Sequence, residues 1–227
     1  LLKENLDIAK RECRFQLKTT IIEDNYILSQ RTAFDRDLFA QESLRQYDLI
    51  IGNPPYKKIG KDALEALAIP EVCYGAPNLY FLFAAMGIKN LKDDAEMVYI
   101  IPRSWTSGAY FEKFRKFLFS HACIEYIHLF ESRNKVFDKE SVLQETMIVK
   151  FKKNTRFPSC ITISTSATNK DFSDLHKLDV PYQVVVSDNH YYVHLVTDEE
   201  EVKSLQSINH FKNTLVDLGL KMKTGLV

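Results

Sequence analysis

The sequence predicts an α/β fold built on a mostly parallel, doubly wound sheet. Apolar runs of strand length alternate with amphipathic stretches of helix length through residues 48–130. Such alternation is typical of parallel strands joined by helical crossovers. The segment "AEMVYIIP" at residues 95–102 reads as one apolar run, as expected of a strand that is covered on both faces.

The expected elements follow one another in a regular order. Leu2, Leu6, Ala9 and Cys13 have helical spacing and indicate a first helix. The full set is a helix to about residue 14, strands at 19–23 and 48–52, a helix at 78–90, a strand at 95–102, an amphipathic helix, a strand at 121–130, and a last strand within 141–153.

The composition changes near residue 155, and we therefore predict a domain boundary there. Residues 1–155 would form the first domain. Residues 156–227 begin with turn-rich, polar segments and continue with short strands at 182–187 and 191–196 and two helical segments from Asp198 onward. This second part is predicted to be a linker followed by a small α+β extension.

The composition excludes several classes of protein. With 227 residues and 45% hydrophobic content, the chain can bury a sizeable core. No stretch reaches the roughly 20 apolar residues of a membrane helix, and the charged start is no signal peptide, so we expect a cytoplasmic protein with no membrane partner. The four cysteines lack the spacing of a metal site or a disulfide framework, and we expect reduced thiols.

The net charge of zero hides an uneven distribution. Residues 103–156 carry eleven Lys and Arg against six Asp and Glu, whereas residues 157–201 carry two against eight. The basic middle is compatible with a nucleic acid partner but does not require one, because solvated helix faces give similar clusters.

The most informative segment is "DLIIGNPPY", in which Asn53, Pro54, Pro55 and Tyr56 follow an apolar strand. Ligands of open α/β sheets bind at the carboxyl ends of strands. Each proline fixes the backbone and lacks an N–H, so the loop is stiff and its carbonyls stay available. The Asn53 side-chain oxygen and the Pro54 carbonyl are suited to accept two hydrogen bonds from one amino group, and the Tyr56 ring offers a flat face.

The segment resembles the motif of amino-methyltransferases that use S-adenosylmethionine, especially the gamma-type DNA adenine-N6 methyltransferases of bacterial restriction-modification systems. "NLYFLFAAMGIKNL", "AEMVYIIPRSW" and "KVFDKESVLQETMIVKFKK" follow in the order expected of those enzymes, and "LGLKMKTGLV" looks like the entrance to their target-recognition region. The resemblance implies a methyltransferase-type sheet. Residues 1–155 would be a partial catalytic domain, and residues 156–227 a linker and the start of the recognition region.

The resemblance also implies roles for individual residues. Asn53, Pro54 and Tyr56 match the residues that hold and stack a target adenine flipped out of double-stranded DNA, and Pro55 stiffens their loop. Phe137 matches a second aromatic that packs on that base, although a core phenylalanine is an equally good interpretation. A cognate restriction endonuclease, fused or separate, is the implied protein partner.

Further residues are matched upstream and downstream of the motif. Asp24, in "IIEDNYIL", looks like the acid that binds the adenine amino group of the cofactor, with Tyr26 as a neighbouring wall. Lys57, Lys58 and Lys61 follow the motif directly, where phosphate contacts would hold a flipped nucleotide. A solvated loop is the alternative for each lysine.

One departure from the family pattern is large. The glycine-rich loop that cradles the methionine part of the cofactor is missing, because the sequence contains no Gly-x-Gly. The acid expected to hold the cofactor ribose is missing as well. We therefore interpret the chain as an amino-terminally truncated part of a longer enzyme. Alone, it should be inactive and bind S-adenosylmethionine weakly or not at all.

Two other patterns suggest no additional site. Glu201 and Lys203 have the Glu-x-Lys spacing of some nucleases, but the acidic run after Asp198 favours a helix start. His190 and His194 flank a strand-like segment without the closeness of a metal pair, so no metal site is predicted.

Two rival functions remain open at this stage. A protein-glutamine or RNA-base amino-methyltransferase would use the same loop, although the turn-rich extension counts against it. The other is a noncatalytic DNA-binding subunit that retains only the fold.

Overall fold

The computed structural model describes residues 2–13, 16–34, 45–130, 145–167, 172–173, 175–187, 190–211, 213 and 215–221. Its helices are α1 (Leu2–Glu12), α2 (Tyr26–Ser29), α4 (Leu64–Ala68), α5 (Leu79–Asn90), α6 (Glu112–His121), α7 (Tyr182–Val185) and α8 (Glu199–Asn209). Short 3-10 helices span Arg31–Phe34, Pro70–Val72, Arg103–Thr106 and Ala109–Phe111. The strands are β1 (Tyr47–Gly52), β2 (Leu91–Pro102), β3 (Cys123–Phe130), β4 (Thr146–Lys152), β5 (Cys160–Ser166) and β6 (His176–Pro181).

The strands form one sheet in the order β1-β2-β4-β3-β5-β6. β1 pairs parallel with β2, β3 pairs parallel with β5, and β4 lies antiparallel between β2 and β3. Consequently β1, β2, β3 and β5 run in the same direction and their carboxyl ends share one edge. The prediction of an α/β fold is confirmed, and the sheet is mixed, because β4 and β6 run antiparallel to the other four strands.

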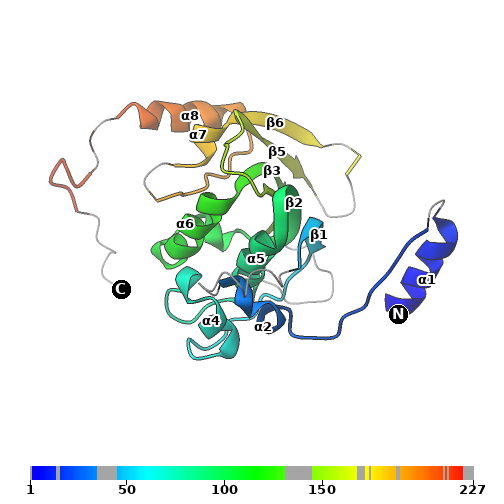
Figure 1. The fold of residues 1–227 in the computed structure, drawn as a ribbon. Helices are drawn as coiled ribbons and strands as arrows, with labels where there is room; N and C mark the ends of the chain where they lie inside the picture. The colour runs from blue at the N-terminus through cyan, green and yellow to red at the C-terminus, as the bar shows by residue number, and fades with distance from the viewer. Residues whose placement is uncertain are drawn as a thin grey trace.

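The core lies between the sheet and the helices α5 and α6, which cover one face (Figure 1). Tyr99, Val149, Ile127 and Ile163 are aligned across four strands on this face, and all are buried. The helix α5 supplies most of the opposing apolar surface, with Tyr80, Leu82 and Met86 fully buried. This packing explains why the predicted helix at 78–90 ends where β2 begins.

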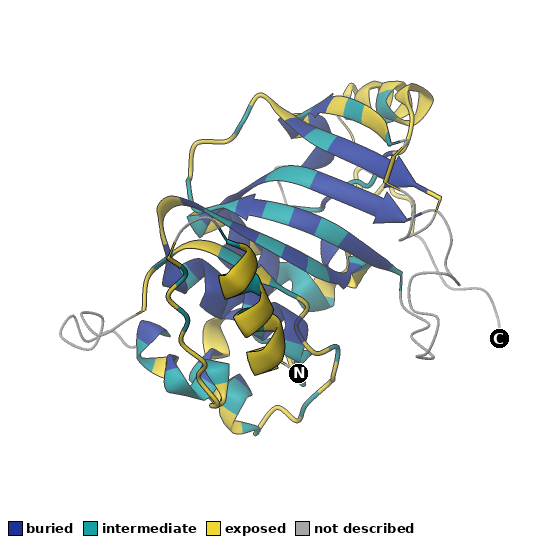
Figure 2. Ribbon diagram, turned by 90° about the vertical axis from the view of Figure 1, so that its right-hand side faces the viewer, coloured by how far each residue is buried: buried dark blue, intermediate teal, exposed yellow. Residues whose placement is uncertain are grey.

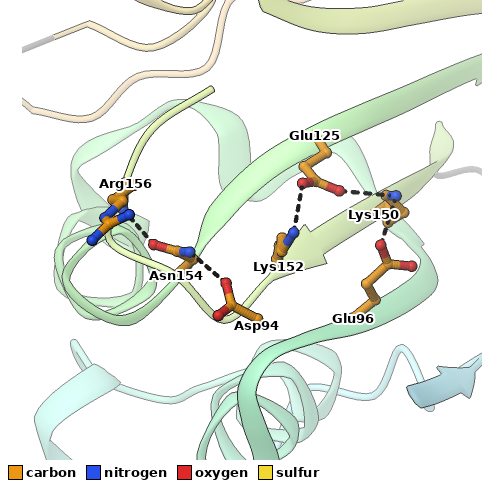
Figure 3. Close-up of polar contacts among 7 residues, drawn as sticks. All are labelled: Asp94, Glu96, Glu125, Lys150, Lys152, Asn154 and Arg156. Atoms are coloured by element: carbon orange, nitrogen blue, oxygen red, sulfur yellow. Dashed lines mark hydrogen bonds and ion pairs between the residues drawn. The ribbon is translucent and has the colours of Figure 1, made fainter. Parts of the chain in front are cut away.

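The central strands β3 and β4 consist of buried and intermediate residues (Figure 2), and on the face away from α5 they carry charged residues. Lys150 Nζ lies 3.0 Å from Glu96 Oε1 and 2.8 Å from Glu125 Oε2, and Lys152 Nζ lies 3.7 Å from Glu125 Oε1 (Figure 3). The charges alternate across β2, β4 and β3, so they neutralise one another. Opposite charges on facing strands stabilise a sheet modestly.

The edge strand β1 differs from this centre. Among the described residues it pairs with β2 alone, and it exposes Leu49 (51%) and Ile51 (73%) on the face opposite α5. The helix α1 stands apart from the sheet and buries no residue (Figure 1). The strand expected at 19–23 is wrong, because these residues have no regular secondary structure.

The carboxyl-terminal part packs against the loop after β2. Arg115 of α6 is 0% exposed, and its Nη1 lies 3.0–3.1 Å from the carbonyl oxygens of Trp105, Ser107 and Gly108. Its Nε donates to the His190 carbonyl at 3.0 Å. One buried guanidinium therefore fastens residues 105–108 and residue 190 together.

Two sequence expectations for this part are wrong. Residues 182–187 contain the helix α7 rather than a strand, and residues 191–196 form only an isolated bridge, Val186 to Val193. Short apolar runs do not distinguish a buried helical turn from a strand. Here Val184 and Val185 are buried by one turn of helix after Pro181. The sheet itself continues past residue 155, since β5 pairs with β3, and the domain boundary stays a prediction.

Candidate functional site

A cleft of about 410 Å³ opens beside β1 at the carboxyl edge of the sheet. It is lined by Tyr26, Tyr47, Leu49, Ile50, Ile51, Gly52, Asn53, Pro54, Pro55, Phe83 and Tyr99. The structure thus brings Tyr26 together with Asn53, Pro54 and Pro55, which are far apart in the sequence. A mostly apolar cleft with a few convergent polar groups is the usual form of a small-molecule site.

The loop that carries the motif is fixed from behind. The Lys57 carbonyl accepts a hydrogen bond from Leu79 N at 2.8 Å, and Ile59 N donates to the Pro77 carbonyl at 2.8 Å. These two bonds join the loop to the start of α5. With Pro54 and Pro55 limiting backbone rotation, the loop keeps one conformation.

The acceptors predicted in this loop are available. Asn53 is exposed and Pro54 is buried at the cleft wall. Among the described residues, no hydrogen bond is made to the Asn53 side chain or to the Pro54 carbonyl. Both oxygens can therefore accept a donor from a ligand.

Gly52 is required at the end of β1. A Cβ at this position would lie 2.9 Å from Tyr99 Cε1, which is closer than real Cβ atoms approach a neighbour. The glycine lets the Tyr99 ring lie against the backbone that leads into Asn53. The ring then forms part of the cleft wall.

Tyr56 is held differently from its neighbours and does not line the cleft. Its hydroxyl donates to the Ile100 carbonyl at 2.9 Å, and its ring meets Tyr80 edge to face with centroids 6.3 Å apart. Burial raises the pKa of Tyr56 to about 12, so the phenol stays neutral. The ring is thus supported at its hydroxyl end.

Of the two predicted cofactor residues, Tyr26 lines the cleft and Asp24 does not. The Tyr26 ring packs against Phe83 with centroids 5.5 Å apart, and burial raises the pKa of its hydroxyl above its ordinary value. Asp24 is exposed and does not line the cleft. One of its carboxylate oxygens accepts from Asn25 N at 2.7 Å, which leaves the other oxygen for a ligand.

The three predicted lysines do not line the cleft. Lys57, Lys58 and Lys61 are exposed just after the motif and outside the lining. Phe137 lies outside the described residues. Glu201 and Lys203 lie in α8, where Asp198 accepts from Glu201 N at 2.8 Å as an N-cap, so the helix interpretation is confirmed.

The sequence alone did not identify Phe83, Tyr99, Leu49 and Ile51 as parts of the site. The sequence did contain a signal for Tyr99. If the two predicted strands pair in parallel, a residue of the second strand lies beside the end of the first, and in the structure Tyr99 pairs with Gly52. Nothing local in the sequence marks Phe83. Within the described residues, no group of three or more His, Cys, Asp or Glu is placed to hold a metal ion, and no helix is long and apolar enough to cross a membrane.

Comparison with known proteins decides the family. The model for the Eco57I restriction-modification methylase matches residues 2–137. The Type II methyltransferase M.PstI of Providencia stuartii is 33% identical over 98% of this chain, and M.BsuBI of Bacillus subtilis is 31% identical over 93%. This chain belongs to the Eco57I restriction-modification methylase family. The resemblance inferred from the motif is confirmed.

The chain spans 44% of M.PstI and 42% of M.BsuBI, less than half of either relative. Among solved structures, the type IIG restriction endonuclease BpuSI aligns with a TM-score of 0.47 and 18% identity, covering 61% of this chain and 20% of that protein. Because this score is below 0.5, the assignment to the Eco57I family rests on the sequence comparisons.

Proposed function

We propose that the whole protein is a site-specific DNA methyltransferase of a restriction-modification system, and that it methylates N6 of adenine. The observation that supports this proposal is the cleft in which the rigid Asn53-Pro54-Pro55 loop faces the aromatic wall of Tyr26 and Phe83. The membership of the Eco57I restriction-modification methylase family is consistent with it.

The acceptors in the loop suit an aromatic amine. Such a nitrogen is a poor nucleophile because its lone pair is delocalised into the ring. If the Asn53 side-chain oxygen and the Pro54 carbonyl each accept one N–H, the nitrogen becomes more pyramidal and its lone pair is directed out of the ring plane. No protein nucleophile is then required.

The fit of the cofactor to this chain is partial. The Tyr26 and Phe83 side chains form an apolar wall that suits a purine ring. Asp24 does not line the cleft, but it has a carboxylate oxygen free to accept from an exocyclic amine. When bound, S-adenosylmethionine supplies a methyl group on a positively charged sulfur. The chain lacks a Gly-x-Gly loop for the methionine part, so we assign no residue to that end.

The last part of the proposal concerns the residues that would contact DNA. A target adenine has to leave the duplex, and stacking inside a pocket offsets the cost of a few kcal/mol. Tyr56, supported by Ile100 and Tyr80, is the proposed stacking surface. The exposed Lys57, Lys58 and Lys61 are proposed phosphate contacts, and Phe137 a second stacking residue.

The experiment compares the full-length protein with Asn53→Ala, each incubated with S-adenosylmethionine and unmethylated duplex DNA. Asn154→Ala is a matched control, because Asn154 bonds to Asp94 at the opposite edge of the sheet. Mass spectrometry of the digested nucleosides should find N6-methyladenine with the wild type and the control. The Asn53 variant should be slower by about 10²–10³-fold, as when other active sites lose one polar contact to the reacting group.

Other outcomes would redirect the assignment. A wild-type protein that binds S-adenosylmethionine but yields no methylated deoxynucleoside would contradict the DNA substrate. RNA bases and glutamine-bearing proteins would then be tested with the same pair of variants. A wild-type protein that binds DNA but no cofactor would indicate a noncatalytic subunit.

A further inference from the structure

Asn90 is a buried polar residue that the proposed mechanism does not use. It is the last residue of α5, and its side chain is 0% exposed. An amide in such a place is costly unless its oxygen and both of its N–H groups find partners. Here all three do.

The partners of Asn90 come from two other segments. Its Oδ1 accepts from the Tyr26 hydroxyl at 2.8 Å. Its Nδ2 donates to Gln30 Oε1 at 3.2 Å and to the Arg45 carbonyl at 2.9 Å. Arg45 N in turn donates to the same Gln30 oxygen at 3.3 Å, so the network is closed.

This network joins the three pieces of chain that surround the cleft. Tyr26 and Gln30 belong to the segment that carries the aromatic wall, and Arg45 lies just before β1, which leads into the motif. The helix α5 contributes Asn90 and, two turns earlier, Phe83, against which the Tyr26 ring packs. The Tyr26 ring is therefore held by a tilted contact with Phe83 and, at its hydroxyl, by Asn90.

We propose that Asn90 is a positioning residue for cofactor binding, acting through Tyr26. This inference rests on the proposed function, because it takes the cleft to be where the purine of S-adenosylmethionine binds. A wall that is already ordered binds a flat ring without a further loss of side-chain freedom. Asn90 touches neither the cofactor nor the substrate.

The test uses the full-length enzyme with Tyr26→Phe, Asn90→Ala and the double variant. Tyr26→Phe keeps the ring and removes only the hydroxyl. Tyr126→Phe is the matched control, because it removes a tyrosine hydroxyl bonded at 2.6 Å to Ser164 on the opposite face of the sheet. The KM and dissociation constant for S-adenosylmethionine and the kcat at saturating cofactor are measured for each.

We expect Tyr26→Phe to raise KM and the dissociation constant by about 3- to 10-fold, which is the effect of one lost hydrogen bond. Asn90→Ala should raise them by at least as much, because it also removes the bonds to Gln30 and to the Arg45 carbonyl. The kcat should stay within about two-fold, since the lost interaction is the same before and during the reaction. The double variant should bind the cofactor no more weakly than Asn90→Ala alone, because Asn90→Ala already removes the hydrogen bond that Tyr26→Phe removes. The control should match the wild type.

A purely structural role predicts a different pattern. Loss of stability without a change in cofactor affinity, or additive effects in the double variant, would overturn the inference. Should Asn90→Ala not fold, an unchanged KM in Tyr26→Phe alone would overturn it. If the wild type itself binds no S-adenosylmethionine, the proposed function has failed, and that result differs from all of the above.

Discussion

The loops after β1 and β2 leave the same edge of the sheet, yet they use their polar groups in opposite ways. After β2, the carbonyls of Trp105, Ser107 and Gly108 all accept from Arg115, and the Thr106 carbonyl accepts from Val193 N. After β1, the oxygens of Asn53 and Pro54 have no partner among the described residues. The backbone carbonyls of residues 105–108 are paired within the protein, whereas the loop after β1 keeps acceptors for a ligand.

This difference separates a supporting loop from a binding loop. Buried polar groups are nearly always paired, because leaving one unpaired costs free energy. A free acceptor is tolerated when water or a ligand can reach it, as at the exposed Asn53. Variants in the loop after β2 should therefore change stability, whereas variants in the loop after β1 should change binding or activity.

The largest effect is expected for Arg115→Met. The substitution leaves four backbone carbonyls without their donor, one in a buried hydrogen bond and three in part-buried ones. The free energy of unfolding should fall by about 3–5 kcal/mol, because four hydrogen bonds are lost at about 1 kcal/mol each. Urea denaturation measures this change in the free energy of unfolding.

Arg156→Met, at an exposed position, is the control and should change stability by less than about 0.5 kcal/mol. Equal effects for both would contradict the supporting role.

A smaller effect is expected from adding one methyl group to each loop. Gly108 has φ +80°, a conformation that strains any other residue, and Gly108→Ala should cost about 1–2 kcal/mol although nothing lies within 4 Å of the added atom. Gly60 follows the other loop with no positive φ and free space around it. Gly60→Ala should be neutral to within about 0.5 kcal/mol. Thermal unfolding of both variants tests the comparison, which fails if Gly60→Ala is the more harmful.

The smallest effect is expected within the loop after β1 itself. Tyr56→Phe removes the bond to the Ile100 carbonyl and should lower the free energy of unfolding by about 1 kcal/mol. Asn53→Ala removes no internal bond, so its stability should stay within about 0.5 kcal/mol of the wild type. Denaturation of the two variants side by side decides this. A destabilised Asn53→Ala would mean that the side chain has an internal role.

Much of the fold was predictable because local patterns determine single elements. The strand before Asn53, the helix at 78–90 and the helix start at Asp198 follow from apolar periodicity and capping, and all three are confirmed. Strand order is a different matter. Nothing in the segment around Val149 indicates that β4 inserts antiparallel between β2 and β3, because that choice depends on packing against distant strands.

The same limit applies to the site. The motif identified Asn53, Pro54 and Pro55 because all their relevant chemistry lies in adjacent residues. The sequence does not mark Asn90, because an asparagine at the end of a helix is common. Its role depends on hydrogen bonds to Tyr26 and Arg45, which are 64 and 45 positions away in the sequence. Phe83 likewise resembled any core residue of α5.

Gly52 restricts which substitutions this sequence can accept during evolution. Any side chain there would displace the Tyr99 ring and reshape the cleft before it unfolded the sheet. A mutation at position 52, directly before the Asn-Pro-Pro-Tyr motif, would therefore first change which ligands the cleft admits. In a library that randomises the motif to alter substrate choice, position 52 belongs among the residues held constant.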